Sequence, residues 1–285
     1  RVRERVRVYR NLWGRSPEEF ADSAKEAISN SMTAVKVSPA GPTPDVISRV
    51  QLDEMEAVVS AVRDAVGPTV DLAIDLHGRL TPAASRRAIH ALSKYDPFFI
   101  EEPCLPDGSA SHLADLRALR TAQPVAIATG ERLRSAHAFA EHLLPSPVVD
   151  IIQPDVSMVG GIRASVEIGA MASAAQVAMA PHCPYGPVQF AASIQVAATS
   201  PAHLIQEFQS LGGAGSGGGA PGGGQNWAFE LLSQPFSIEM GYVEISSRPG
   251  LGIEVLEERI DEHMDMWNPH PPTVWNHPDG SHAEW

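Results

Sequence analysis

Short apolar runs and amphipathic segments alternate along almost the whole chain, and this alternation restricts the fold more than any other feature. The apolar runs have the length of strands, and a helix-like segment follows each of the first seven. Strands that alternate with helices form a parallel sheet, and eight such units close into a barrel. We therefore predict an α/β fold, a TIM-type (β/α) barrel, with strands at 6–12, 33–38, 70–76, 98–101, 125–129, 148–153, 177–180 and 203–206.

Helix boundaries support this division of the chain. Ser16 and Glu19 have the spacing of a capping box, with Pro17 at the first helical position. Gly67 is a typical stop for the second helix. An open doubly wound sheet is the alternative architecture. It is disfavoured because no GxGxxG motif follows the first strand and because polar residues follow six strands instead of gathering at one switch point.

Composition narrows the classes of function. The chain has 285 residues, 44% hydrophobic and 19% charged, which suits one barrel of roughly 250 residues. Its net charge of −13 disfavours nucleic acid and anionic membranes as partners, whereas a bound divalent metal would still allow an anionic small substrate. Two cysteines are too few for a disulfide framework, and no apolar run approaches the ~20 residues that span a bilayer. We therefore expect a cytoplasmic protein.

Polar residues follow the third to eighth predicted strands, at the end where barrel enzymes carry their active sites. These residues are Asp75, His77, Glu101, Glu131, Asp155, His182 and Glu207. Crowded carboxylates repel each other, so a cation must compensate them. Asp75, Glu101 and Glu131, on three successive strands, offer the oxygen ligands that Mg²⁺ prefers. Only one residue of the pair Glu101 and Glu102 can point inward, and the other should contact the neighbouring loop.

Two of the histidines follow strands on opposite sides of the predicted barrel mouth. Asp75 and His77 are two residues apart, so we expect both to point to the same side of the strand. His77 and His182 suit an elimination, in which one residue takes a proton and the other gives one to the leaving group. Asp155 neighbours His182, and a carboxylate bonded to one ring nitrogen makes the other more basic. We expect the other nine of the 11 histidines to be solvated.

Short motifs surround these strand ends: DLHGR at 75–79, IEEP at 100–103, GER at 130–132, QPD at 153–155, APHCP at 180–184 and QE at 206–207. The tail adds PGLG at 249–252 and DGSHAEW at 279–285. With these motifs, the chain resembles the mandelate racemase group of the enolase superfamily, and within it the acid-sugar dehydratases, most closely galactonate dehydratase. The resemblance extends over nearly the whole chain.

The resemblance implies a role for each site residue. Asp75, Glu101 and Glu131 would bind Mg²⁺, which would hold the substrate carboxylate. His182, paired with Asp155, would be the base, and His77 the acid that protonates the departing 3-hydroxyl. Glu207 would hydrogen-bond an oxygen derived from the substrate carboxylate. The reaction would convert a sugar acid such as D-galactonate to a 2-keto-3-deoxy sugar acid.

The chain departs from this family in two ways. Racemases and lactonising enzymes of the family carry Lys-x-Lys on the second barrel strand, whereas here Ser38 follows Lys36. The absence of the second lysine disfavours those activities, and we interpret Lys36 as a polar strand end. The family also has an N-terminal α+β capping domain, and the chain begins at the first barrel strand, so we expect it to be a fragment or a truncated product.

The domain organisation follows from these boundaries. We predict a barrel with the active site over 1–210, a Gly-rich linker or disordered loop over 211–226, and a C-terminal segment over 227–285 that packs on the barrel and on the capping domain. The full-length protein is expected to be a homo-oligomer that acts on a small sugar acid. The alternatives are a dehydratase for gluconate, mannonate or arabinonate, a truncated non-catalytic barrel, and a zinc hydrolase, which the all-carboxylate ligand set disfavours.

Overall fold

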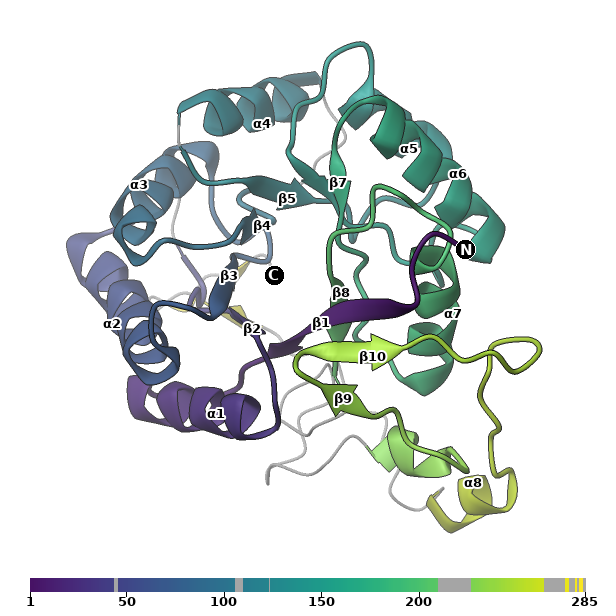
Figure 1. Cartoon of the computed structure of the whole chain (residues 1–285). Helices are drawn as coiled ribbons and strands as arrows, with labels where there is room; N and C mark the ends of the chain where they lie inside the picture. Colours follow the sequence, from purple (N-terminus) through teal and green to yellow (C-terminus); the bar gives the residue numbers. More distant parts are fainter. Residues whose placement is uncertain are drawn as a thin grey trace.

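The computed structural model describes residues 1–43, 46–105, 110–122, 124–209, 227–263, 275–276, 280 and 282–283. Strands and helices alternate through the described part, and helices α1 to α7 form a ring outside the strands (Figure 1). The strands are β1 (Arg5–Asn11), β2 (Ala34–Val37), β3 (Asp71–Asp75), β4 (Ile100–Glu101), β5 (Ile127–Thr129), β6 (Ile151–Ile152), β7 (Ala178–Met179), β8 (Gln206–Phe208), β9 (Ile238–Glu239), β10 (Tyr242–Glu244), β11 (Trp275–Asn276) and β12 (His282–Ala283).

Among the helices, the first begins and the second ends where the sequence signals place them. The helices are α1 (Pro17–Ser29), α2 (Arg49–Val66), α3 (Pro82–Leu92), α4 (Ala110–Ala122), α5 (Ala136–Leu143), α6 (Gly161–Ala174), α7 (Pro187–Ala197) and α8 (Glu258–His263), with short 3-10 turns at Ser93–Tyr95 and Trp227–Leu231. The Ser16 hydroxyl accepts a hydrogen bond from the backbone nitrogen of Glu19, as the capping pattern predicts. Gly67 follows α2 with φ +73°, a conformation that favours glycine.

The barrel closes through its last strand. β1 to β7 pair in sequence order and in parallel, and β8 pairs in parallel with β1. The backbone nitrogen of Leu204 donates to the carbonyl of Met179 at 2.8 Å, and a parallel bridge joins Met179 to His203. The eighth strand was predicted at 203–206, and it lies at Gln206–Phe208 because residues 203–204 contact β7 before the chain joins β1. The predicted barrel is confirmed.

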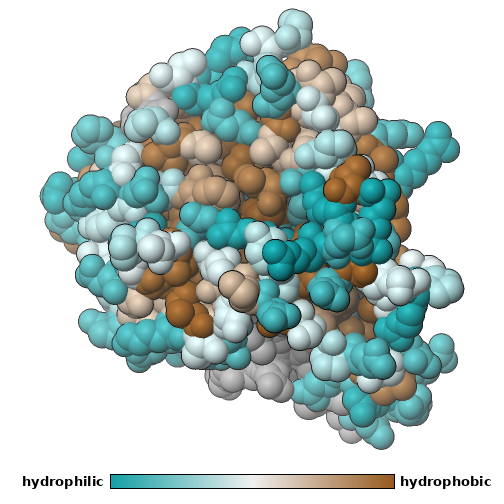
Figure 2. Space-filling model, in the orientation of Figure 1, coloured by the Kyte–Doolittle hydropathy of each residue, from teal (hydrophilic) through white to brown (hydrophobic). Residues whose placement is uncertain are grey.

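Apolar side chains fill both the barrel and the layer beneath the helices. α2 buries Met55, Val59, Val62 and Val66 against the sheet, as its 3.6-residue period predicts. A second cluster takes one residue from each barrel strand or its flank: Tyr9, Ala34, Ala73, Phe99, Ala128, Ile151, Ala180 and Ile205. Figure 2 shows hydrophilic residues over much of the ring, with hydrophobic residues gathered near the middle of the face seen in Figure 1. The barrel interior is therefore a packed core, and the polar strand ends lie outside it.

Three histidines contradict the expectation that those outside the site are solvated. His112, His142 and His203 are buried, with 4%, 5% and 8% of their surface exposed. His142 lies on the inner face of α5, where its Nδ1 lies 2.9 Å from the carbonyl oxygen of Ala138. Burial lowers the pKa of His142 below its usual value and, helped by the charge of Arg3, lowers the pKa of His203 to about 3. Both residues are therefore neutral near pH 7.

The described part of the C-terminal segment packs on the barrel. β10 pairs antiparallel with β1, with Val243 opposite Val6, and β9 pairs with β10. The centre of the Phe236 ring lies 4.8 Å from the centre of the Phe190 ring and 6.5 Å from that of the Phe208 ring. The predicted strand over 242–246 is shorter, at Tyr242–Glu244. The predicted linker at 211–226, and most of the tail after residue 263, lie outside the described residues. Among described helices, none has the length and apolar character needed to cross a bilayer.

Candidate active site

The barrel strands bring three carboxylates together. Asp75 is the last residue of β3 and is opposite Glu101 at the end of β4. Glu131 follows β5 by two residues. One carboxylate oxygen of each residue lies within 4.8 Å of those of the other two. Asp75 and Glu101 are buried, whereas the side chain of Glu131 is 12% exposed, so the cluster opens on one side.

Lys36 lies within this carboxylate cluster, and the interpretation of it as a simple polar strand end was wrong. Only 3% of its surface is exposed. Its Nζ lies 2.8 Å from Glu101 Oε2, 3.3 Å from Glu207 Oε1 and 3.7 Å from Asp75 Oδ2. The ammonium is also 5.2 Å from the centre of the Tyr9 ring. A charge inside the otherwise apolar strand β2 was the sequence signal for a buried ion pair.

His182 and Asp155 form the predicted pair. His182 Nδ1 lies 2.9 Å from Asp155 Oδ2, and its Nε2 faces the carboxylate cluster, 3.5 Å from Glu131 Oε2. Burial opposes protonation of His182, but its bond to Asp155 and the charges of Glu207 and Glu131 outweigh burial and raise its pKa to about 9. Asp155 also accepts a hydrogen bond from the backbone nitrogen of Ser157, at 2.8 Å. Nδ1 is thereby the protonated nitrogen, and Nε2 can exchange a proton with the cavity.

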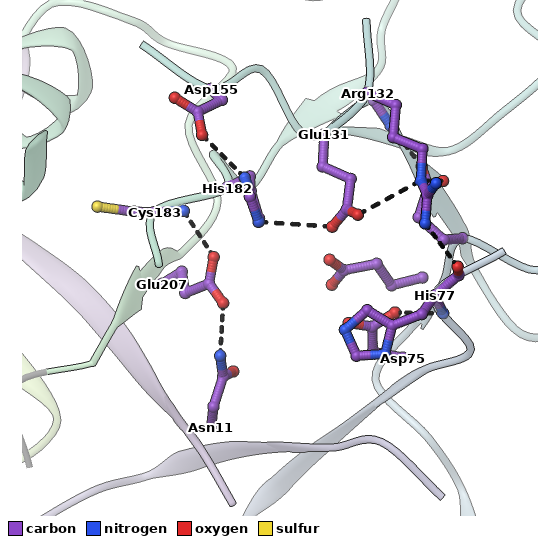
Figure 3. Close-up of polar contacts among 12 residues, drawn as sticks. Asn11, Asp75, His77, Glu131, Arg132, Asp155, His182, Cys183 and Glu207 are labelled. Carbon is purple, nitrogen blue, oxygen red and sulfur yellow. Dashed lines mark hydrogen bonds and ion pairs between the residues drawn. The ribbon is translucent and has the colours of Figure 1, made fainter. Parts of the chain in front are cut away.

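His77 lies across the cluster from His182, as Figure 3 shows. The expectation that His77 and Asp75 share one side of a strand does not apply, because β3 ends at Asp75 and His77 has a left-handed backbone (φ +52°). The turn folds the ring back, so that His77 Nε2 lies 3.0 Å from Asp75 Oδ2. The backbone nitrogen of His77 donates to the other oxygen of Asp75 at 2.8 Å. The two histidines still line one cavity from opposite sides.

Glu207 is held by groups that sequence reasoning did not identify. Asn11 Nδ2 and the backbone nitrogen of Cys183 each donate to it at 2.6 Å. Burial opposes ionisation of Glu207, but Lys36, His182 and these donors outweigh it and lower its pKa. Glu207 is thus an acceptor. Asn11 ends β1 and was detectable as one more polar residue at a strand end.

Glu102 points away from the cluster, as expected for one residue of the Glu101–Glu102 pair. It accepts hydrogen bonds from the Thr129 hydroxyl and from the backbone nitrogen of Gly130, the latter at 3.0 Å. Burial, together with the charge of Glu131, raises the pKa of Glu102 to about 7. Gly130 has φ +136°, and an added Cβ would lie 2.7 Å from the Phe139 ring. A side chain at position 130 would therefore disturb the turn that carries Glu131.

A cavity of about 550 Å³ opens above the cluster. Its lining includes the carboxylates Asp75, Glu131 and Glu207, both site histidines, Lys36, the arginines Arg79, Arg132 and Arg134, and the aromatic residues Trp13, Phe20 and Tyr185. The base of the cavity is acidic, and the arginines add positive charge to its wall. The volume suits a small polar molecule.

The donor set fits a hard divalent cation. The carboxylates of Asp75, Glu101 and Glu207 lie within 3.7 Å of the Lys36 ammonium, and Glu131 clusters with Asp75 and Glu101. Glu101 Oε1 is buried and has no hydrogen-bond partner among the described residues. A buried carboxylate oxygen without a partner is costly, and coordination of a cation would remove that cost. All-oxygen ligation is what Mg²⁺ prefers.

Known proteins are similar to this chain over most of its length. The family model described as "Enolase C-terminal domain-like" matches residues 19–259. The D-galactonate dehydratase of Variovorax paradoxus (strain S110) is 35% identical over 289 residues, which cover all of this chain and 72% of that relative. The D-gluconate dehydratase of Thermoproteus tenax is 34% identical over 267 residues, which cover 92% of this chain. The chain spans 50% of the length of that second relative.

Solved structures agree with the sequence matches. A structure from Burkholderia SAR-1, assigned as a mandelate racemase/muconate lactonizing enzyme, superposes with a TM-score of 0.84 at 32% identity, over all of this chain and 68% of its own. An enolase from Agrobacterium radiobacter, considered a galactarate dehydratase and solved with sodium and L-malate, has a TM-score of 0.85 at 28% identity, over 99% of this chain and 71% of its own. The chain therefore belongs to the enolase C-terminal domain-like family.

Proposed function

We propose that the chain is the catalytic barrel of a Mg²⁺-dependent sugar-acid dehydratase. The observation that carries this proposal is the histidine oriented by Asp155, whose other ring nitrogen, Nε2, faces the three clustered carboxylates. A base beside an anionic cluster can take a proton from an acid substrate when a metal ion holds that substrate at the cluster. The names of relatives at about 35% identity, D-galactonate dehydratase among them, support the same chemistry.

Asp75, Glu101 and Glu131 would hold the metal. A bound Mg²⁺ would supply Lewis-acid chemistry, attracting the substrate carboxylate and acidifying the adjacent C–H bond. Its charge would also offset the carboxylates that raise the pKa of His182 to about 9. His182 would then be neutral, the form in which it can act as a base.

The two histidines divide the proton transfers. His182 Nε2 takes the proton from the carbon beside the carboxylate, while Asp155 stabilises the imidazolium that forms. His77, on the opposite side, gives a proton to the 3-hydroxyl as its bond to carbon breaks, so that water leaves. The resulting enol tautomerises to the 2-keto-3-deoxy acid. One proton and one hydroxide leave the substrate, which balances the loss of one water.

Glu207 and Lys36 control charge beside the substrate carboxylate. Because its pKa is lowered, Glu207 is ionised before substrate arrives, and it must take up a proton before it can donate a hydrogen bond to a substrate oxygen. Lys36 lies 3.3 Å from Glu207 and 2.8 Å from Glu101. We assign Lys36 to balancing these acids, and not to proton abstraction.

The experiment is a screen of sugar acids with the full-length protein and Mg²⁺. D-Galactonate, D-gluconate and galactarate are the first substrates, because these acids appear in the names of similar proteins. We expect Mg²⁺-dependent release of a 2-keto-3-deoxy acid from at least one of them, and loss of the product with a chelator. Failure of the metal-loaded protein to dehydrate any of the acids would reject the proposal. The non-catalytic barrel would then be the better explanation.

A further inference from the structure

Three guanidinium groups line the cavity, and two of them are held by the protein. Arg132 donates to the carbonyl of His77 at 2.8 Å and lies 3.6 Å from both Glu102 and Glu131. Arg79 donates to the carbonyl of Ala40. Both side chains are therefore engaged in positioning the loops around the site.

Arg134 differs from these two. It is exposed at the cavity wall and makes no hydrogen bond or ion pair with any residue in the described ranges. Tyr185 is another exposed residue of the cavity lining, and its ring centre lies 6.2 Å from that of His182. Arg134 and Tyr185 line the same cavity. A guanidinium without a partner in the described part of the chain thus lines the same cavity as the candidate base and the Tyr185 ring beside it.

The β5–α5 loop fixes the position of Arg134 relative to the carboxylate cluster. Glu131 and Arg134 are three residues apart in the sequence. Between them, the backbone nitrogen of Leu133 donates a hydrogen bond to the carbonyl oxygen of Gly130 at 3.1 Å. The next residue, Ser135, caps α5 through a hydrogen bond from Ala138. The positive end of the α5 dipole therefore adds to the positive potential around Arg134. One short loop supplies both an acid at the base of the cavity and, at its wall, a cation that is unpaired among the described residues.

With a divalent cation held by the carboxylates at the base, a substrate that is anionic at both ends would complement this cavity. One carboxylate would approach the metal at Glu131, and the second would find the fork of donors on Arg134. We propose that Arg134 binds the distal carboxylate of a six-carbon sugar diacid and makes the enzyme prefer diacids to monoacids of the same stereochemistry. This inference rests on the proposed function and narrows its substrate class.

The test compares galactarate with D-galactonate, which share the configuration of their inner carbons and differ in whether the sixth carbon is a carboxylate or a hydroxymethyl group. The full-length protein with Mg²⁺ is assayed for kcat/KM on both. We expect galactarate to be preferred at least tenfold. Arg134→Gln should lower kcat/KM for galactarate by about 100-fold, as for loss of a charged hydrogen-bonded partner, and leave D-galactonate within about threefold. Arg134→Lys, which keeps the charge but not the fork, should lie between.

A matched control and two outcomes make the test decisive. Arg163→Gln removes another exposed arginine, whose partner is Glu167 on α6, and should change neither substrate. If no acid is dehydrated by the unmodified protein, the proposed function itself fails. If D-galactonate is processed at least as well as galactarate, or Arg134→Gln weakens both substrates equally, the dehydratase stands and the role of Arg134 is wrong.

Discussion

Replacing Lys36 by methionine tests whether the carboxylate cluster needs an internal cation. The substitution keeps the length of the side chain and removes the ammonium that lies 2.8 Å from Glu101. Asp75, Glu101 and Glu207 would then face each other, all buried, without that counter-ion. Removing one partner of a buried ion pair costs about 3–5 kcal/mol. We expect the metal-free variant to lose stability by that amount.

A divalent cation should reverse part of this loss. Binding at 100 times Kd stabilises a folded protein by about 2.7 kcal/mol. In Lys36→Met the metal no longer shares the carboxylates with an ammonium, so Mn²⁺ or Mg²⁺ should bind more tightly than in the unmodified protein. Protonation of the carboxylates relieves repulsion at acid pH, so the loss of stability should be larger at pH 8 than at pH 6.

The assay is urea unfolding of the full-length protein, with a chelator and with saturating Mg²⁺, combined with calorimetric titration of Mn²⁺. Lys94→Met is the matched control, because Lys94 pairs with Glu56 on the surface, where its side chain is 58% exposed. Such a pair contributes about 0–1 kcal/mol. If Lys36→Met loses no more stability than Lys94→Met in the chelator, or binds Mn²⁺ more weakly than the unmodified protein, the reasoning is refuted.

Three further predictions concern separate parts of the fold. Asp155→Asn should leave the far-UV circular dichroism unchanged and lower kcat by about 10⁴-fold, because the tautomer of His182 would no longer be fixed. Near-normal turnover of this variant would mean that Asp155 has only a structural role. Gly130→Ala should lower the free energy of unfolding in urea by about 1–3 kcal/mol and weaken Mn²⁺ binding, because an alanine at φ +136° is strained and would press on Phe139. The control is Gly41→Ala, which has open space around it and should change neither quantity. In the folded protein the pKa of His203 is lowered from 6.5 to about 3. As the pH drops, the unfolded chain therefore takes up this proton before the folded chain does. The free energy of unfolding should fall by up to roughly 1.4 kcal/mol per pH unit between pH 6.5 and pH 3. His203→Leu should flatten that dependence, whereas His137→Gln, at a side chain that is 87% exposed, should preserve it.

The alternation of strands and helices was readable from the sequence because each element carries its own period. Apolar residues recur at about every fourth position in α2, and the buried strands are short runs between turn residues. Strand ends were equally local, since a polar residue after an apolar run marks where the chain leaves the core. For this reason Asp75, Glu101 and Glu131 could be assigned to one end of the barrel before the structure was known.

Contacts between distant parts of the chain were decided by the tertiary structure. Lys36 and Glu101 are 65 positions apart, and no local pattern indicates that the ammonium lies 2.8 Å from that carboxylate. The burial of His112, His142 and His203 likewise depends on which helix face or strand end meets the sheet. Arg132 and Arg134 are chemically identical and two residues apart, yet only Arg132 has ionic partners among the described residues. Sequence periodicity determines which residues reach the barrel mouth, whereas closure of the barrel determines which of their charges are paired, because pairing depends on distances that only the folded chain sets.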